Sequence, residues 1–375
     1  FMAIGFLLAI WIAGRRARRA GLEPGTIITL ALIGGPLGYF GARAMHVLHY
    51  AGGAVRRGEI GAGQAISQAT GLEVMGGVVL GVVGVIVYLR RARKPVAQYL
   101  DVVFPPMILA MGIGRLGCLM YGCCWGAVCA TDAGKPALPW AIRFPYGSPV
   151  YERQWEEKKL SPPEELLWTS PQTKSREPIP RALLERDERV ANEIVRRYVD
   201  NLEARAALGN ADSQSAEVIQ ARHEAAALKA NLPGKTDGEK ADYVAAALHL
   251  RRWSAKRGAP LTLADLRTLA AAEHSQWVHP TQIYDAFALA LLFLVLSVIH
   301  ARRPRAGTVV AWTMMLYPLN RFAQEFIRAD NPHDVGGLTI SQFLSLAVFL
   351  AGIVLAIILA KSAPPAASPS LAASP

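Results

Sequence analysis

The stretch GRLGCLMYGCCWG, residues 114–126, concentrates residue types that could do chemistry. Arg115 is a permanent cation whose planar guanidinium group binds phosphate or carboxylate oxygens in pairs. Cys118, Cys123 and Cys124 carry thiols, which bind metals, form disulfides or act as nucleophiles. The residues alone leave three possibilities open: a metal site, a disulfide-linked knot, or a catalytic pocket.

A second set of ionisable residues lies in LYPLNRFAQEFIR, residues 316–328. Arg321 and Glu325 are four residues apart, which predicts an ion pair on one helix face, and Arg328 continues that face one turn later. Ionisable residues within apolar segments are rare and usually functional. This arrangement predicts a pocket for an anion attached to a lipid, such as a phosphodiester headgroup.

The elements that must position these residues are membrane spans. The chain has 375 residues, of which 52% are hydrophobic and 18% are charged, and its apolar runs are near the ~20 residues that a helix needs to cross a bilayer. The first span is expected to be cut short, because the chain begins inside an apolar run. The seven predicted spans cover residues 1–13, 26–48, 72–89, 99–120, 281–300, 307–327 and 338–360.

Basic clusters set the predicted orientation of the spans. RRARR at 15–19, RRARK at 90–94 and ARRPR at 301–305 follow the first, third and fifth spans. Because cytoplasmic loops are rich in Lys and Arg, we predict an all-α polytopic seven-helix protein with its N-terminus outside and its C-terminus inside. The net charge of +11 is then explained by these anchors, and no nucleic-acid partner is predicted.

The spans are predicted to bring several cations to one layer of the membrane. At ~1.5 Å per residue, Arg115 lies roughly 24 Å and Arg321 roughly 21 Å into their spans, counted toward the same outer face. Arg43 lies late in the second span, and HPTQIYD, residues 279–285, opens the fifth span on that face. The candidate site is therefore expected near the outer interface.

Four domains are predicted from these patterns. Residues 1–126 hold spans one to four, 127–278 form a large extracytoplasmic insertion, 279–361 hold spans five to seven, and 362–375 form a disordered tail rich in Ala, Pro and Ser. The insertion is expected to be irregular to about residue 180 and mostly helical after that, with Thr262 as the N-cap of its last helix. Its predicted helices cover residues 178–209, 215–232, 238–257 and 261–274.

These motifs, in this order, resemble the prolipoprotein diacylglyceryl transferases of bacteria. The resemblance rests on GRLGCLMYGCCWG, HPTQIYD, LYPLNRFAQEFIR and the late GGLTISQFLS, together with GFLLAIWIAGRRARRAG, GARAMHVLHY and GLEVMGG nearer the N-terminus. It covers roughly 220 residues of the membrane part and does not extend to the 127–278 block.

The resemblance implies a concrete reaction. Such enzymes transfer the diacylglyceryl group of phosphatidylglycerol to the lipobox cysteine thiol of preprolipoproteins and release glycerol phosphate. They need no metal or organic cofactor, so none is expected here. The resemblance also implies a monomer in the bacterial cytoplasmic (inner) membrane, with its active site toward the periplasmic face, that binds phosphatidylglycerol and preprolipoprotein signal peptides.

Site residues follow from the resemblance, position by position. Arg115 matches the arginine of the family's GR-x-G motif, Arg321 and Glu325 match its R-x-x-x-E pair, and Tyr317 matches the tyrosine one turn earlier. These four are the expected catalytic residues, with the two arginines neutralising the phosphate and Glu325 orienting Arg321. The expected substrate-binding residues are Arg43, Gly126, His279, Gln282, Tyr284 and Cys118.

Three positions depart from the family pattern. Cys118 stands where the family has asparagine, Cys123 lies near its glutamate, and Met75 replaces the histidine that is its candidate base. A base from elsewhere, such as His279, Glu73, His46 or His49, is one alternative. A neighbouring arginine that lowers the thiol pKa is another.

The departures keep a second function open, namely a catalytically silent relative that binds anionic lipid or lipoprotein and presents the helical insertion to partners. They also leave the cysteine roles open. The spacing C-x4-C-C-x4-C matches no common zinc pattern. The alternatives are small packed residues, a disulfide that involves Cys129, a direct role of a thiol, and a structural metal.

Overall fold

The computed structural model describes residues 1–47, 74–169, 175–181, 184, 253–254, 259–260, 263–303, 305–329 and 337–362. The chain divides into two compact units, Phe1–Met120 with Thr281–Pro375, and Tyr121–Pro280. Most of the predicted helix at 178–209, all of that at 215–232, most of that at 238–257, the N-cap Thr262 and nearly all of the tail 362–375 lie outside the described residues.

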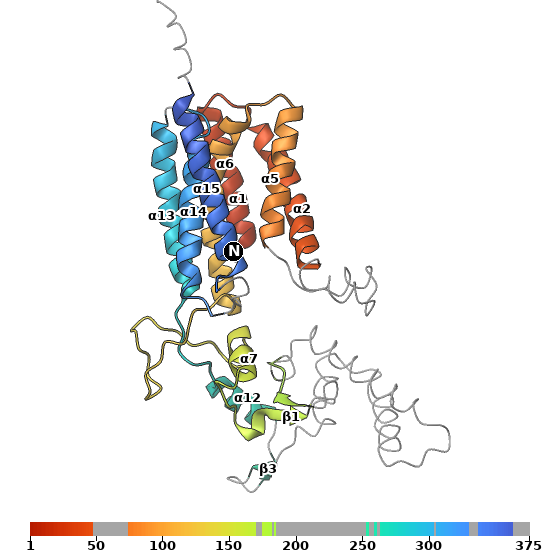
Figure 1. The fold of residues 1–375 in the computed structure, drawn as a ribbon. Helices are drawn as coiled ribbons and strands as arrows, with labels where there is room; N and C mark the ends of the chain where they lie inside the picture. The colour runs from red at the N-terminus through yellow and green to blue at the C-terminus, as the bar shows by residue number, and fades with distance from the viewer. Residues whose placement is uncertain are drawn as a thin grey trace, which may run out of the picture. The chain divides into compact units, whose positions relative to one another are not determined.

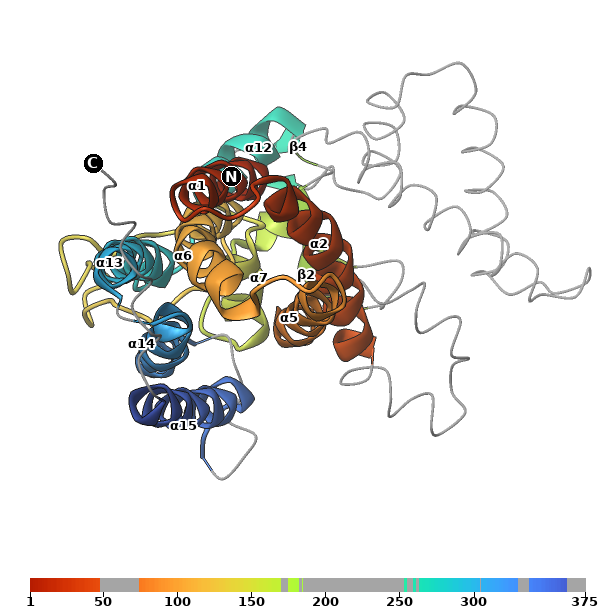
Figure 2. The ribbon, with the colours of Figure 1, turned by 90° about the horizontal axis from the view of Figure 1, so that it is seen from above.

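The first unit consists of long helices that run side by side (Figures 1 and 2). A helix lies over each stretch in which a span was predicted, although the ends differ. The first helix extends through the basic run that follows its apolar part, because Arg and Ala are strong helix formers. The helices are α1 Met2–Arg19, α2 Gly25–His46, α5 Val74–Arg91, α6 Val96–Tyr121, α13 Thr281–Arg302, α14 Thr308–Glu325 and α15 Ile340–Lys361.

Four of these helices are long and apolar enough to cross a membrane, judged by length and composition. They are α2, α6, α13 and α15. Two of them present apolar side chains outward at helical spacing, namely Phe287, Leu291, Leu294 and Val298 on α13, and Phe343, Leu346, Leu350 and Val354 on α15. Exposed apolar faces of this kind are typical of helices that contact lipid.

Helix α6 lies at the centre of the first unit (Figure 2). Its first half contributes Tyr99 and Val102 to a core shared with α1, α2 and α5. Further along, Ile108 joins Leu289 of α13 and Val309 of α14 in a second core. Helix α6 therefore contributes side chains to both cores.

A buried carboxylate fixes the start of α14 against α6. Asp101 is fully buried and accepts hydrogen bonds from the backbone N–H groups of Gly307, at 2.8 Å, and Val310, at 3.1 Å. Arg303 Nε lies 3.3 Å from the same carboxylate. The first N–H groups of a helix have no partner within the helix, so this side chain from another element satisfies them.

Glycines let α2 and α5 pack closely. A Cβ built on Gly77 would lie 2.6 Å from the carbonyl oxygen of Gly38, and Cβ atoms on Gly41 or Gly76 would collide with the facing backbone. Small residues at such contacts allow backbones to approach within a membrane. The paired glycines of GLEVMGG therefore have a packing role.

The second unit has a small hydrophobic core of its own. Tyr146, Tyr151, Leu166 and Leu266 are among its buried members. The Tyr146 hydroxyl donates to the carbonyl oxygen of Ile179 at 2.8 Å, and burial raises the pKa of the Tyr146 and Tyr151 phenols, so both stay protonated. Its described elements are α7 Pro149–Glu156, the 3-10 helix η2 Glu164–Leu166, β1 Leu167–Thr169, β2 Arg176–Pro178, β3 Trp253–Ser254, β4 Ala259–Pro260 and α12 Leu263–Ala272.

Two predictions for the insertion were wrong. The part expected to be irregular contains α7, where Ser148 is the N-cap and Pro149 occupies the first turn, a combination that favours helix initiation. It also contains the antiparallel pair β1 and β2. Trp253–Ser254 pairs with Ala259–Pro260 as strands instead of ending the helix predicted at 238–257. Gly258 and Pro260 are the two residue types least compatible with a helix.

Candidate functional site

Asp285, in the first turns of α13, organises the polar cluster in the first unit. Its Oδ2 atom lies 2.5 Å from Arg115 Nε on α6. Its Oδ1 atom accepts hydrogen bonds from Asn320 Nδ2 at 3.1 Å and Gln324 Nε2 at 2.8 Å, both on α14. Only 8% of the Asp285 side chain is exposed. Both carboxylate oxygens are thus engaged, and three helices meet at this one side chain.

Arg321 and Glu325 form the ion pair that their spacing predicted. Nη1 of Arg321 contacts Oε2 of Glu325, whose side chain is fully buried. The other end of the guanidinium group, Nη2, lies 3.2 Å from Ser341 Oγ in the first turn of α15. The start of α15 is itself fixed by a capping box between Thr339 and Gln342. Arg321 is therefore held from two helices.

Tyr317 lies near both of these arrangements. The charges of Asp285, Arg115, Arg321 and Arg328 all act on its hydroxyl group, and its ring packs against the core shared by α6, α13 and α14. Arg321 also interacts electrostatically with Arg115 and Arg328. Arg115 and Arg321, which were predicted to share a depth in the membrane, therefore interact electrostatically.

Helix periodicity explains how α14 supplies so many of these groups. Tyr317, Arg321 and Glu325 are spaced four residues apart and lie along one face. Asn320 and Gln324 form the neighbouring stripe, and Gln324 Nε2 lies 3.3 Å from Asn320 Oδ1. One stripe therefore carries the ion pair, while the other holds Asp285 of α13.

The remaining predicted substrate-binding residues lie in several places. Gln282 and Tyr284 are in the first turns of α13, where Gln282 is buried. Gly126 and His279 are neighbours in the second unit, where the Gly126 N–H donates to the His279 carbonyl oxygen at 3.0 Å. Arg43 is half-buried near the end of α2, a helix that packs mainly against α5.

The candidate bases are described only in part. Glu73 and His49 lie outside the described residues. His46 and Met75 belong to α2 and α5, but their side chains are not among those described. These alternatives therefore stay predictions.

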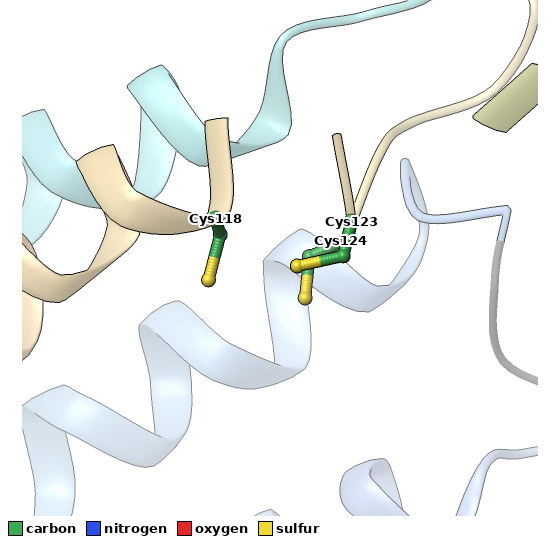
Figure 3. Close-up of side chains that lie close together, drawn as sticks. All are labelled: Cys118, Cys123 and Cys124. Atoms are coloured by element: carbon green, nitrogen blue, oxygen red, sulfur yellow. The ribbon is translucent and has the colours of Figure 1, made fainter. Parts of the chain in front are cut away.

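Three of the four cysteines form a cluster (Figure 3). The sulfur atoms of Cys118, Cys123 and Cys124 all lie within 4.8 Å of one another, and each residue is half-buried. Cys129 is buried elsewhere, where its N–H donates to the Trp277 carbonyl oxygen at 2.7 Å. All four cysteines lie in the described part of the chain, and the structure forms no disulfide among them.

Four members of the cluster around the arginines were not predicted as site residues. Asp285 was noticed as part of HPTQIYD, yet its contact with Arg115 was missed. An acidic residue within an apolar segment is itself a signal for a buried cation partner. Asn320, Gln324 and Ser341 carry no comparable signal, because uncharged polar residues are common in helices.

The arrangement is suited to binding an anion. The guanidinium groups of Arg115 and Arg321 are paired with the carboxylates of Asp285 and Glu325, and Arg321 also interacts with the charge of Arg328. Asp285 Oδ2 contacts Nε of Arg115, and a guanidinium group carries further N–H donors on its two Nη atoms. Guanidinium N–H donors bind phosphate oxygens in pairs.

Residues 1–358 match the family model described as prolipoprotein diacylglyceryl transferase. Among curated proteins named phosphatidylglycerol–prolipoprotein diacylglyceryl transferase, that of Rhodopirellula baltica is 36% identical over 159 residues, which are 41% of this chain and 30% of that protein. That of Dehalococcoides mccartyi is 32% identical over 154 residues, or 41% and 57% of the two chains. That of Corynebacterium glutamicum is 30% identical over 165 residues, or 42% and 46%. The match thus spans 30% to 57% of the length of these relatives.

Proposed function

The chain belongs to the prolipoprotein diacylglyceryl transferase family, and from this premise we propose that it transfers the diacylglyceryl group of phosphatidylglycerol to the lipobox cysteine thiol of preprolipoproteins. Glycerol phosphate is the second product. One observation carries the proposal, namely that two arginines on neighbouring helices are each held by a buried carboxylate, Arg115 by Asp285 and Arg321 by Glu325. The names of the curated relatives support the same activity.

The cations of the site suit this substrate. A phosphodiester carries one negative charge, which the guanidinium groups of Arg115 and Arg321 would bind. When the glycerol phosphate departs, a second negative charge develops on the phosphate oxygen. Fixed guanidinium groups stabilise that developing charge more than the ground state, which is the requirement for catalysis.

The reaction is a substitution at carbon. The thiol sulfur forms a bond with the glycerol carbon of the diacylglyceryl group, and the bond between that carbon and the phosphate oxygen breaks. The electron pair leaves with the phosphate, and the thiol proton is released. Tyr317 contributes a hydroxyl donor beside both arginines, and Gln282, Tyr284, His279, Gly126, Arg43 and Cys118 are proposed to contact the substrates.

We place the site near the outer face of a bacterial cytoplasmic membrane. The exposed apolar faces of α13 and α15 support contact with lipid, and the basic clusters support seven crossings with the N-terminus outside. In this orientation the 127–278 insertion is periplasmic, between spans in 1–126 and 279–361, and 362–375 is a cytoplasmic tail. The enzyme is proposed to act as a monomer on phosphatidylglycerol and the signal peptides of preprolipoproteins.

The test is transfer in a defined mixture. The full chain, purified in detergent, is incubated with phosphatidylglycerol and a lipobox peptide, and the peptide is examined by mass spectrometry. The proposal predicts a thioether-linked diacylglyceryl peptide, and none when the peptide cysteine is replaced by serine. Binding of phosphatidylglycerol without any product would contradict the proposal and favour a catalytically silent relative.

A further inference from the structure

The cysteine cluster has the composition of a catalytic zinc site. Such sites supply three protein ligands and keep a fourth position open for water or substrate, whereas structural zinc sites supply four ligands. Cys118, Cys123 and Cys124 are three thiols with their sulfur atoms within 4.8 Å of one another. With Zn–S bonds of about 2.3 Å, tetrahedral ligands lie about 3.8 Å apart, so each sulfur pair needs to close by roughly 1 Å or less.

The local backbone brings the three sulfur atoms to one place. Cys118 projects from the last turn of α6, and Cys123 and Cys124 project from the residues that follow it (Figure 3). In an extended chain, adjacent side chains point in opposite directions. Here Gly122 has φ +79° and Cys124 has φ +60°. Positive φ is uncommon for a residue other than glycine.

The cluster also lies next to the proposed chemistry along the chain. Cys118 is three residues after Arg115, about one helical turn away on α6. The family's candidate base is absent at Met75, so the incoming thiol needs another means of activation. A metal-bound thiol is deprotonated outright, because the positive ion stabilises the thiolate.

We propose that Cys118, Cys123 and Cys124 bind one Zn²⁺ ion as thiolates and that the open fourth position binds the thiol of the lipobox cysteine. This inference rests on the proposed transferase function. Binding releases the thiol proton to solvent and presents a thiolate to the glycerol carbon. The carbon–oxygen bond then breaks, and its electron pair leaves with the phosphate held by the arginines, so no electron donor or acceptor is needed. The expectation that no metal takes part would then be wrong for this chain.

The first measurement uses Co²⁺ as a spectroscopic substitute for Zn²⁺, with the full chain in detergent and a phosphine reductant. We expect one Co²⁺ per chain with an intense thiolate-to-metal absorption band. Cys118→Ser, Cys123→Ser and Cys124→Ser should each weaken binding by at least the ~10–100-fold that even outer-shell changes cost. Cys129→Ser is the matched control and should bind normally, since Cys129 lies outside the cluster.

One further variant and the addition of a lipobox peptide make the result decisive. Cys118→His keeps a zinc ligand, so it should bind Co²⁺ with an altered spectrum, which separates loss of a ligand from misfolding. Adding a lipobox peptide should increase the thiolate band by about a third, from three thiolates to four, and the serine peptide should leave it unchanged. No thiolate band in the reduced wild type, or equal binding by the cysteine-to-serine variants, would overturn the inference.

Failure of this inference and of the transferase function would look different. Transfer at an unchanged rate by protein freed of metal would overturn the zinc site and leave the transferase function intact. A thiolate-bound Co²⁺ ion in a protein that transfers no lipid would retain the metal site and overturn the transferase function.

Discussion

At the scale of single residues, the proposed chemistry depends on how the guanidinium groups of Arg115 and Arg321 are held. The Arg321–Glu325 pair was predictable, because a spacing of four places two residues on one helix face regardless of tertiary structure. The Arg115–Asp285 pair was not, since residues 115 and 285 meet only through the packing of α6 against α13. Sequence therefore identified the cations but only one of their two carboxylate partners.

Replacing Arg321 with lysine tests whether its fork geometry matters. Lysine keeps the charge but cannot make paired hydrogen bonds to a phosphate. Its single ammonium nitrogen also cannot contact Glu325 and Ser341 together. We expect kcat to fall well beyond tenfold in the transfer assay, while the protein still folds. Unchanged turnover would mean that Arg321 has only a structural role.

Replacing Asp285 with asparagine tests the positioning of Arg115. The amide removes the charge that holds Arg115 and places a donor against Asn320 or Gln324, which donate to the native carboxylate. We expect kcat to fall by roughly a hundredfold, the effect of a misplacement of about 1 Å, with partial rescue by Asp285→Glu.

The exposed Asp132 provides the control for this variant. Asp132→Asn removes one carboxylate from the surface of the second unit and should leave kcat unchanged. A loss in Asp285→Asn that appears only as a higher KM, with kcat intact, would contradict a role in positioning for the transition state.

At the scale of elements, buried contacts between helices set the geometry that the site needs. Most helix ends were predictable to within a few residues, because apolar runs mark the extent of the helices. The end of α1 was not, since that helix continues through its basic run to Arg19. The contacts between the helices could not be predicted from the sequence. Asp101 shows this best, since it caps α14 from α6 although about 200 residues separate the two in sequence.

Asp101→Ala is expected to destabilise the first unit. It leaves two helix N–H groups and Arg303 without this buried partner, at a cost of roughly 2–4 kcal/mol in the free energy of unfolding. Reversible denaturant unfolding in micelles measures the change, with Asp132→Ala as the surface control. Equal stabilities of the two variants would show that the Asp101 contacts contribute little.

Glycine packing between α2 and α5 gives a second test at this scale. Gly77→Ala places a methyl group 2.6 Å from the Gly38 carbonyl oxygen, so the helices must separate, at a cost of roughly 1–3 kcal/mol. Gly14→Ala in α1 is the matched control, because nothing lies within 4 Å of a Cβ there. That control should be neutral or gain up to about 1 kcal/mol. Similar effects of the two changes would contradict close packing at Gly77.

At the scale of the whole molecule, the membrane unit was more predictable than the insertion. Hydrophobic runs and charge asymmetry follow directly from the bilayer, which is the same for all membrane proteins. The insertion has no such external constraint. Its β1–β2 pair and its α7 depend on local capping and on a small core around Tyr146 and Tyr151, which helical periodicity alone does not reveal.

The central claim is that the arginines hold the phosphate as a leaving group while a thiol attacks carbon. Phosphatidylglycerol labelled with ¹⁸O at the oxygen between the diacylglyceryl carbon and phosphorus tests it directly, with the lipobox peptide as acceptor and mass spectrometry of both products. The account predicts a thioether-linked peptide without label and released glycerol phosphate that carries all of it. Label retained in a diacylglycerol product, or no lipidated peptide at all, would contradict the account.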